Sequence, residues 1–529
     1  MATPASRPAL VVAVLATCGL VVSLMQTLVV PLLPQFPRLL DASPATVAWL
    51  VTATLVAGAV CAPVLGRLGD MFGKRRMLLV AIGLVTVGSA LGAAAPDIGT
   101  LIVARALQGA SLGVVPLGIS IMRDLLPPGR VGSGIALMST SLGIGGAVGL
   151  PITGLVAQHA SWRWLFVGAT VLGALLFTLV ARVVSESPER SGGHFDLPGA
   201  FGLAVALVAL LLAISKGGEW GWGGPRVLGL LAFSAVAFML WGRLELRARS
   251  PLVDLRVTAR PAVLWTNVAS ILIGFGMFAG FLVTTQILQA PVAAGYGFGL
   301  SLVAAGLVLL PNGGAMAVFS PLSARLSARF SARTTLVVGA TVLALGNVGL
   351  ALLPPSIPLV MVASGVTAVG AALAYSALPL LIMAAVPPTE TAAANSLNTL
   401  MRMLGTSSCS AVAAAVATGL TTVVAGQTLP AAAAYTTVFL AAAGASLVAA
   451  VIAVLTPRCA APTAPAPGRQ RMIRQLLVAW AQRRPVPSQS LASASAVLPP
   501  RCTTSPSQRT SPDSALRARR NFTDRSRLV

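Results

Sequence analysis

Long apolar runs separated by short polar segments make up most of the first 456 residues of the chain. A helix needs about 20 apolar residues to cross the hydrocarbon core of a bilayer. Fourteen runs meet this pattern, and twelve of them contain no charged residue, whereas Arg105 and Arg402 each interrupt one. The runs are 9–33, 45–65, 77–95, 100–122, 132–157, 164–181, 197–215, 227–242, 261–288, 299–320, 334–353, 357–386, 396–424 and 432–456. The pattern predicts an all-α membrane protein with fourteen spans.

Basic residues are distributed unevenly between the loops on the two sides of these spans. With the N-terminus in the cytoplasm, seventeen Lys and Arg residues fall inside and four outside, namely Arg38, Arg163, Lys216 and Arg226. Because cytoplasmic loops carry an excess of basic residues, both termini are expected inside. Seven tryptophans near predicted helix ends, Trp241 among them, are expected to anchor the helices at the membrane interface. The first run is too long for a cleaved signal peptide, and thirteen more spans follow it.

Composition excludes several classes of soluble protein. Of the 529 residues, 56% are hydrophobic and 9% are charged, whereas soluble domains carry about 25% charged residues. The net charge of +23 does not indicate a nucleic-acid-binding module, because 13 of the 36 basic residues lie in the last 73 residues and most others separate apolar runs. The five cysteines have no CxxC spacing and there are two histidines, so we expect no metal site and no cofactor.

Two segments of the chain repeat one another. Residues 63–78, PVLGRLGDMFGKRRML, align without gaps with 321–336, PLSARLSARFSARTTL, and six positions are identical. The repeat indicates a duplication of a helical bundle, as in one large class of transporters. We therefore expect a six-helix bundle over 1–185, two extra spans over 186–260, and a second six-helix bundle over 261–456. A basic tail follows at 457–529.

The loop GRLGDMFGKRRM at 66–77 combines small and charged residues in a specific order. Gly66 allows a neighbouring helix to approach closely, and Asp70 can face the positive N-terminal end of a helix in the other bundle. Basic side chains at 74 and 75 can pair with Asp124. The segment resembles the loop signature of the major facilitator superfamily, with matches at Gly66, Asp70, Gly73, Lys74 and Arg75.

Two further spans carry motifs of this family. LIVARALQGASLG at 101–113 resembles its fourth-span motif through Arg105, Gln108 and Gly109. An arginine inside a span usually has a function and faces a cavity, and we expect this of Arg105. GIGGAVGLPITG at 143–154 resembles the fifth-span antiporter signature, although Leu150 separates a Gly–Pro pair that the family has in succession. Packing of small residues against a neighbouring helix explains the same pattern; the residues concerned are Gly145, Gly149, Pro151 and Gly154.

SWRWLF, FDLPGA, GEWGWGGP and ELRARSPLVDLRV resemble the fourteen-helix drug:proton antiporters. The resemblance implies a multidrug exporter of the bacterial plasma membrane that exchanges a small-molecule substrate for protons. Where the family commonly has an acid in the first span, this chain has Met25, and none of its 13 acids lies at a predicted membrane midplane. Proton coupling therefore rests on the resemblance, with Arg105, Asp70 and Asp124 as its candidate carriers.

Few polar side chains interrupt the spans, so we expect a largely apolar cavity suited to lipophilic or amphipathic molecules. Candidates for its lining are Met25, Gln26, Thr27, Gln286, Asn398 and Arg402. The stripe containing Asn398 and Arg402 is either a polar cavity wall or a helix end that reaches the headgroups. In the tail, 469–484 reads as an amphipathic helix on the anionic inner leaflet of the bilayer, or as a solvated basic segment.

Other functions remain open at this stage. A facilitator or importer of a small metabolite would show the same spans without proton antiport. A membrane sensor or scaffold could use the basic tail to recruit partners. A membrane-embedded enzyme is disfavoured because no catalytic constellation is present, and nucleotide-driven transport is disfavoured because no GxxxxGK[ST] loop occurs.

Overall fold

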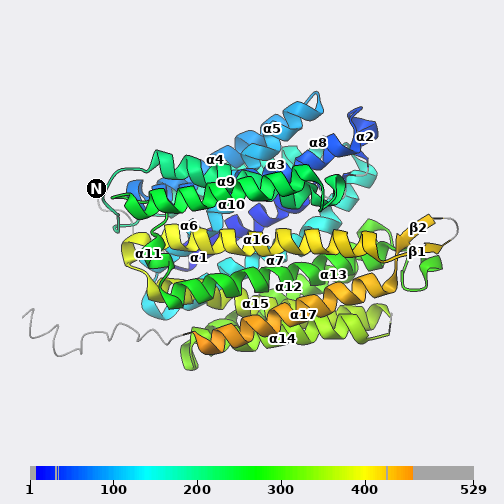
Figure 1. Ribbon diagram of the computed structural model, residues 1–529. Helices are drawn as coiled ribbons and strands as arrows, with labels where there is room; N and C mark the ends of the chain where they lie inside the picture. Colours follow the sequence, from blue (N-terminus) through cyan, green and yellow to red (C-terminus); the bar gives the residue numbers. More distant parts are fainter. Residues whose placement is uncertain (1–7, 30–31, 34, 355, 425–426, 457–529) are drawn as a thin grey trace, which may run out of the picture. The chain divides into compact units, whose positions relative to one another are not determined.

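The computed structural model describes residues 8–29, 32–33, 35–354, 356–424 and 427–456, and all of them belong to one compact unit (Figure 1). Fourteen of its helices, or helical segments, are long and apolar enough to cross a membrane, which confirms the predicted number of spans. The predicted tail, including 469–484, lies outside the described residues. In chain order the elements are α1 (Pro8–Thr27), α2 (Phe36–Leu39), α3 (Pro44–Phe72), α4 (Lys74–Ala93), α5 (Ile98–Gly109), η2 (Ala110–Gly113), α6 (Val114–Leu125), α7 (Pro128–His159), α8 (Arg163–Val183), α9 (Leu197–Trp220), α10 (Pro225–Arg247), α11 (Leu255–Thr258), α12 (Pro261–Gln289), η3 (Val292–Ala294), α13 (Leu302–Arg329), α14 (Ala332–Leu352), α15 (Ile357–Ala385), η4 (Pro388–Glu390), α16 (Thr391–Gly419), β1 (Thr421–Val424), β2 (Gln427–Pro430) and α17 (Ala432–Leu455).

The predicted fourth span is a helix with a change of pitch. α5 and α6 are joined by the 3-10 turn η2, and together they form one candidate span, Ile98–Leu125. Asp97 caps its start, and hydrogen bonds from the backbone amide and hydroxyl of Thr100 lower the pKa of its carboxyl group. α3 packs closely at the junction: a Cβ atom on Gly109 would lie 2.6 Å from the carbonyl oxygen of Thr54.

Two sets of helices pack within themselves and then against each other. In the first half, α7 packs on α1, α4 on α8, and α3 on α5. In the second half, α14 packs on α15 and α17, and α12 packs on α16 and α17. The halves meet where α3 and α6 contact α16 and where α7 contacts α13 and α15. Candidate sites are therefore expected along these two seams.

The extra helices α9 and α10 form a hairpin that packs across one seam. α9 contacts both α3 of the first half and α16 of the second, and Leu203 and Leu207 share a buried cluster with Ala59 and Leu400. Trp241 of α10 belongs to this cluster, is 8% exposed, and donates a 2.9 Å hydrogen bond to the carbonyl oxygen of Gly199. Its prediction as an interfacial anchor is wrong, because the indole is covered by the α9–α10 contact.

Large apolar side chains cover the outside of the helices. Phe201, Val318 and Leu455 are each more than 70% exposed. Soluble monomers rarely expose contiguous apolar surfaces of this kind, which agrees with a chain whose solvent is lipid.

The prediction of a purely helical chain needs one correction. β1 and β2 form a short antiparallel hairpin between α16 and α17, with Thr421 opposite Pro430. The hairpin lies at the end of the bundle opposite α11 (Figure 1). The predicted run 396–424 includes β1, because hydropathy alone does not distinguish a short strand from a helix end.

Candidate functional site

A buried carboxylate joins the two halves at one end of the bundle. Asp70, in the last turn of α3, is fully buried. Its two oxygens accept hydrogen bonds from the backbone amides of Ala392 and Ala393, at 3.2 and 2.8 Å. These amides belong to the first turn of α16, where free N–H groups and the helix dipole favour negative charge. We call this end of the bundle the motif end.

Lys74 adds a second connection at the motif end. Its Nζ atom lies 2.6 Å from an oxygen of Asp124 and 3.7 Å from an oxygen of Asp70. It also donates a 3.0 Å hydrogen bond to Oγ1 of Thr391 on α16. The hydroxyl of Ser187 donates to the same oxygen of Asp124. One buried ammonium thus lies between two carboxylates, and the N-terminus of α16 supplies further positive potential.

The loop between α3 and α4 is shaped by its glycines. Gly73 has a φ of 117°, and a Cβ atom there would lie 2.7 Å from Oε2 of Glu186. Glu186 accepts a 3.0 Å hydrogen bond from the amide of Arg75. The Arg75 guanidinium donates to the carbonyl oxygen of Ala181. The predicted pairing of Arg75 with Asp124 is therefore wrong, because the start of α4 points this side chain toward α8.

Gly66 lies where α3 approaches α16. A Cβ atom on Gly66 would lie 2.8 Å from the carbonyl oxygen of Ala392 and 2.7 Å from Cβ of Ser396. The absence of a side chain lets α3 and α16 come close together. Asp70, one turn after Gly66 on α3, can therefore reach the backbone amides of α16.

Arg105 is buried inside the first half at 2% exposure. Its guanidinium donates to the carbonyl oxygens of Leu50 and Met25, both at 3.2 Å, and to Oε1 of Gln108 at 2.7 Å. Gln108 in turn donates to Ser89 at 2.9 Å. The group ties together α1, α3, α4 and α5. Two backbone carbonyls and the Gln108 side chain surround the charge, and the position of Arg105 beside a cavity stays a prediction.

A second polar group lies inside the second half, on α12, α15 and α16. Asn398 donates hydrogen bonds to Asn267 at 3.0 Å and to Ser270 at 2.6 Å. One turn away, the guanidinium of Arg402 lies 4.8 Å from the ring centre of Tyr375. Both Asn398 and Arg402 are buried. Because both side chains are buried within the protein, the interpretation of this stripe as a helix end that reaches the lipid headgroups is excluded.

A small cavity lies between α7 of the first half and α12, α13 and α15 of the second. Its volume is about 50 Å³, and its lining is mainly apolar, with a few polar side chains: Met277, Phe281, Met316, Asn312, Ser364 and Thr367. Binding pockets for drug-sized molecules usually measure about 300–1,000 Å³. This central cavity is therefore nearly closed in the present conformation.

The predicted cavity residues lie away from this space. Met25, Asn398 and Arg402 are buried elsewhere, Gln26 is half-buried, and Gln286 is exposed. None of these five lines the central cavity, and the side chain of Thr27 lies outside the described residues. Their contact with substrate stays a prediction.

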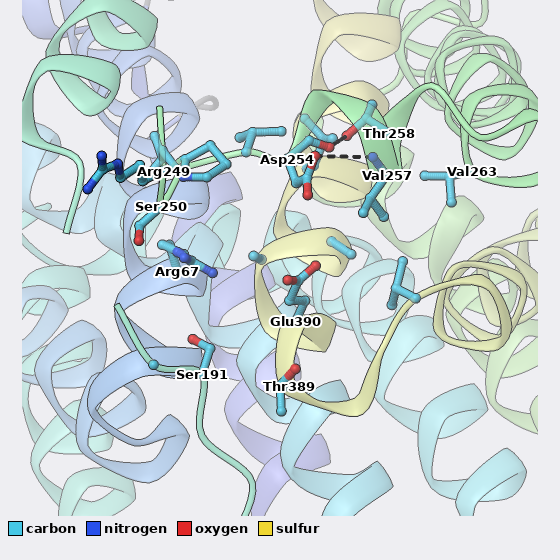
Figure 2. Close-up of a pocket in the computed structure, with 18 of the residues that line it drawn as sticks. Arg67, Ser191, Arg249, Ser250, Asp254, Val257, Thr258, Val263, Thr389 and Glu390 are labelled. Atoms are coloured by element: carbon cyan, nitrogen blue, oxygen red, sulfur yellow. Dashed lines mark hydrogen bonds between the residues drawn. The ribbon is translucent and has the colours of Figure 1, made fainter. Parts of the chain in front are cut away.

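A larger cavity of about 360 Å³ opens at the motif end (Figure 2). The segments 190–192 and 249–258 and the start of α16 line it, together with Arg67 of α3. Figure 2 shows Arg67 pointing into this space between Ser191 and Glu390. The Nε atom of Arg67 and the hydroxyl of Ser191 are buried and have no hydrogen-bond partner among the described residues.

Several residues of these sites were missed from the sequence. Thr391, Ser187 and Tyr375 complete the two networks. A Pro–Thr–Glu–Thr segment at 388–391 does signal a helix start, one of several N-termini that Asp70 could have faced. Ser187 and Tyr375 carry no comparable signal.

The sequence profile of the Major Facilitator Superfamily matches residues 15–408, with a second match over 291–498. This chain belongs to the Major Facilitator Superfamily. Members of the superfamily that are similar to this chain include proteins named as transporters and exporters.

Curated relatives within the superfamily include exporters and resistance proteins. The tetracenomycin C resistance and export protein of Streptomyces glaucescens is 33% identical over 345 residues, covering 64% of this chain and 63% of that protein. The puromycin resistance protein pur8 of Streptomyces alboniger is 35% identical over 346 residues, covering 63% and 67%. The multidrug resistance protein Stp of Mycobacterium tuberculosis is 28% identical over 391 residues, covering 73% and 72%. The matched region thus spans less than two thirds of the tetracenomycin exporter's own length.

The fold of the superfamily also appears in a solved structure. The crystal structure of the human organic anion transporter MFSD10 (TETRAN) superposes with a TM-score of 0.59 at 17% identity, covering 84% of this chain and 99% of that chain. At this identity the likeness concerns the fold.

The segment that resembles the superfamily's antiporter signature lies in α7, between α1 and α13. A Cβ atom on Gly145 would lie 3.1 Å from the amide nitrogen of Leu24 in α1, and one on Gly154 would lie 2.7 Å from a methyl carbon of Val303 in α13. A Cβ atom on Gly306 of α13 would lie 3.0 Å from the ring of Pro151, and Gly149 is buried. These small residues let α7 pack tightly on both halves.

Proposed function

We propose that this transporter is a secondary active exporter of lipophilic or amphipathic small molecules, working by proton antiport and alternating access in the bacterial plasma membrane. The observation that carries the proposal is the buried charge network by which Asp70 and Lys74 connect the first half to α16. The tetracenomycin C, puromycin and multidrug resistance relatives support the class of substrate.

Alternating access requires the contacts at the two ends of the central cavity to break in turn. We take residues 1–185 and 261–456 as the two moving bundles, with 186–260 as the inserted pair of helices. The predicted excess of seventeen basic residues over four on one side supports a cytoplasmic motif end. Opening there has to separate Asp70 from the α16 amides and Lys74 from Thr391. Substrate and protons act by binding the open and closed states with different affinity.

The central cavity supports a lipophilic substrate. Met277, Phe281 and Met316 give it an apolar wall, and Asn312, Ser364 and Thr367 supply few hydrogen-bonding groups. A sugar would leave many polar groups without partners in such a site, at about 1–3 kcal/mol each. An amphipathic molecule needs only the few polar contacts that are present.

The described spans have no carboxylate near their middle, so we assign the coupling proton to Asp70 at the motif end. A proton on Asp70 would remove the charge that holds the α16 N-terminus and would weaken its attraction to Lys74, which loosens the closed state. The ion pair between Lys74 and Asp124 within the first half would then persist. Arg105, buried beside the backbone of α1 and α3, would fix the first-half helices against which this change acts.

The test is transport by the purified chain in proteoliposomes with an imposed pH gradient. We expect fluorescent lipophilic dyes to move against the proton gradient, and their flux to fall to the protein-free level when an ionophore collapses the gradient. A facilitator or importer, the alternative, would give gradient-independent flux. Absence of any protein-dependent flux across a panel of dyes and antibiotics would reject the export proposal.

The basic tail at 457–529 is assigned an accessory function at the anionic inner leaflet. Deletion of 457–529 should leave dye export intact and reduce binding of the detergent-solubilised chain to anionic vesicles. Loss of signalling or partner recruitment with unchanged transport in the deleted chain would instead favour the sensor or scaffold hypothesis.

A further inference from the structure

Arg402 carries a buried positive charge that few groups in the protein balance. It is 4% exposed, and its Nη2 atom donates a 3.1 Å hydrogen bond to Oγ1 of Thr399. The guanidinium lies over the ring of Tyr375. Its Nη1 atom is buried and has no hydrogen-bond partner among the described residues. A buried charged group without its hydrogen bonds is costly, so this nitrogen is available to an acceptor from outside the protein.

Arg105 shows what a satisfied arginine looks like in the same molecule. Three acceptors, the carbonyl oxygens of Leu50 and Met25 and the side chain of Gln108, receive its hydrogen bonds. Arg402 has one such acceptor. Across the described part of the chain, ion pairs with carboxylates involve Lys74 and Lys216 and neither of these two arginines.

No acid in the described residues lies at the depth of Arg402. These acids occur in loops, at helix caps or in the last turn of a helix, as Asp70, Asp124 and Glu245 do. Arg402 is eleven residues beyond Thr391, the first residue of α16, and therefore about 17 Å along the helix axis. The interior charge at this depth is positive.

The Arg402–Tyr375 pair lies outside the lining of the central cavity, one helical turn of α15 further toward the motif end. Ala368 and Ala371 of α15 line that cavity, and Tyr375 follows Ala371 by one helical turn on the same face. A molecule in an enlarged central cavity would meet this pair on the side toward the motif end. Its apolar body would face Met277 and Met316.

The cavity at the motif end has the same sign of charge. Three arginines line it, Arg67, Arg190 and Arg249, against Asp254 and Glu390. Asp254 is already engaged, since it accepts hydrogen bonds from the amides of Arg256 and Val257 at the start of α11. Arginine-rich clefts attract anions and raise their local concentration.

From these observations we propose that the transporter selects lipophilic molecules that carry an anionic group, a carboxylate or an acidic phenol, and that Arg402 binds this group. The inference rests on the proposed export function and specifies its substrate class. Guanidinium groups suit planar carboxylates because they donate two parallel hydrogen bonds. A lipophilic cation would meet uncompensated positive charge at the same place.

The test compares two dyes with the same ring system and opposite charge. Fluorescein is anionic and rhodamine 123 is cationic at neutral pH, and both report flux in proteoliposomes containing the full chain. We expect fluorescein to be carried on the order of tenfold faster than rhodamine 123, as one charge-assisted hydrogen bond allows. Arg402→Gln should remove this preference by slowing fluorescein, and Arg402→Lys should keep part of it. The exposed Arg38 provides the control, Arg38→Gln, with unchanged selectivity.

Equal or faster transport of rhodamine 123 by the unmodified chain would overturn the inference, and so would unchanged fluorescein flux in a folded Arg402→Gln protein. The comparison of dyes in the unmodified chain does not depend on the stability of any variant. If neither dye moves, the wider panel of dyes and antibiotics decides the export proposal separately. Fluorescence polarisation of the two dyes with the detergent-purified chain still decides the charge preference.

Discussion

Oδ2 of Asp70 accepts a hydrogen bond from the backbone amide of Ala393, 2.8 Å away in space and 323 residues further along the chain. The bond connects the last turn of α3 with the first turn of α16 and thus closes one seam between the halves. In the repeated segment at 321–336, the position of Asp70 is occupied by Ala328 and that of Lys74 by Ala332. The duplicated loop therefore lacks the charges that make this connection.

Replacing Asp70 with Asn should loosen the motif end. The amide keeps the shape but loses the charge that favours the α16 N-terminus and Lys74, at a cost of about 2 kcal/mol, or about 30-fold in the closed-to-open equilibrium. The measurement is the labelling rate of a cysteine at Leu397, which lines the motif-end cavity, in a chain whose native cysteines are replaced. Labelling should accelerate in Asp70→Asn.

Asp41→Asn is the matched control for this experiment, because Asp41 lies in a loop at a positive φ of 46° that Asn also tolerates. Its labelling rate should equal that of the parent. Equal rates in Asp70→Asn and the parent would show that this carboxylate does not hold the end closed.

Lys74→Met should destabilise the protein strongly. It leaves Asp70 and Asp124 buried next to each other without the ammonium that lies between them, and breaking a buried ion pair costs about 3–5 kcal/mol. Thermal unfolding in detergent measures the loss. The double variant Lys74→Met with Asp124→Leu should regain part of the stability. If the losses of stability from the two substitutions simply add, the expected interaction between Lys74 and Asp124 is contradicted.

Gly145→Val should abolish transport by forcing α7 away from α1. A Cβ atom at this position would contact the carbonyl oxygen of Leu20 and approach the Leu24 amide nitrogen to 3.1 Å. Overpacking of this kind costs about 1–3 kcal/mol. Gly168→Val on α8 is the control, since nothing lies within 4 Å of a Cβ atom there. Dye flux normalised to the amount of folded protein decides between them.

Arg105→Ala should reduce dye flux by about tenfold or more, because it removes the links from α5 to α1 and α3 and leaves Oε1 of Gln108 buried without its donor, at about 1–3 kcal/mol for that group. The exposed Arg226 gives the control Arg226→Ala, with normal flux. If Arg105 also takes part in coupling, the residual flux of Arg105→Ala will no longer respond to the pH gradient. Unaltered flux and coupling would remove Arg105 from the mechanism.

Much of the site could be predicted because its residue types stand out locally. Charges at Asp70 and Lys74 next to glycines, and an arginine inside an apolar run at 105, are unusual in a membrane span whatever surrounds them. The expected approach of another helix at Gly66 and the expected helix N-terminus opposite Asp70 both have counterparts in the structure. The identity of that helix could not be derived, since any of several helix starts satisfies the same electrostatic rule.

The sequence by itself determined the fourteen crossings and the family, because hydropathy over about 20 residues is a property of each segment alone. Tertiary structure decided the partners. It directed Arg75 to Ala181 instead of Asp124, buried Trp241 between α9 and α10, and left Arg402 over Tyr375 with one nitrogen unsatisfied. Such contacts depend on how helices distant in the chain pack and rotate against one another, and the lipid-facing and protein-facing sides of an evenly apolar helix carry little pattern to reveal this.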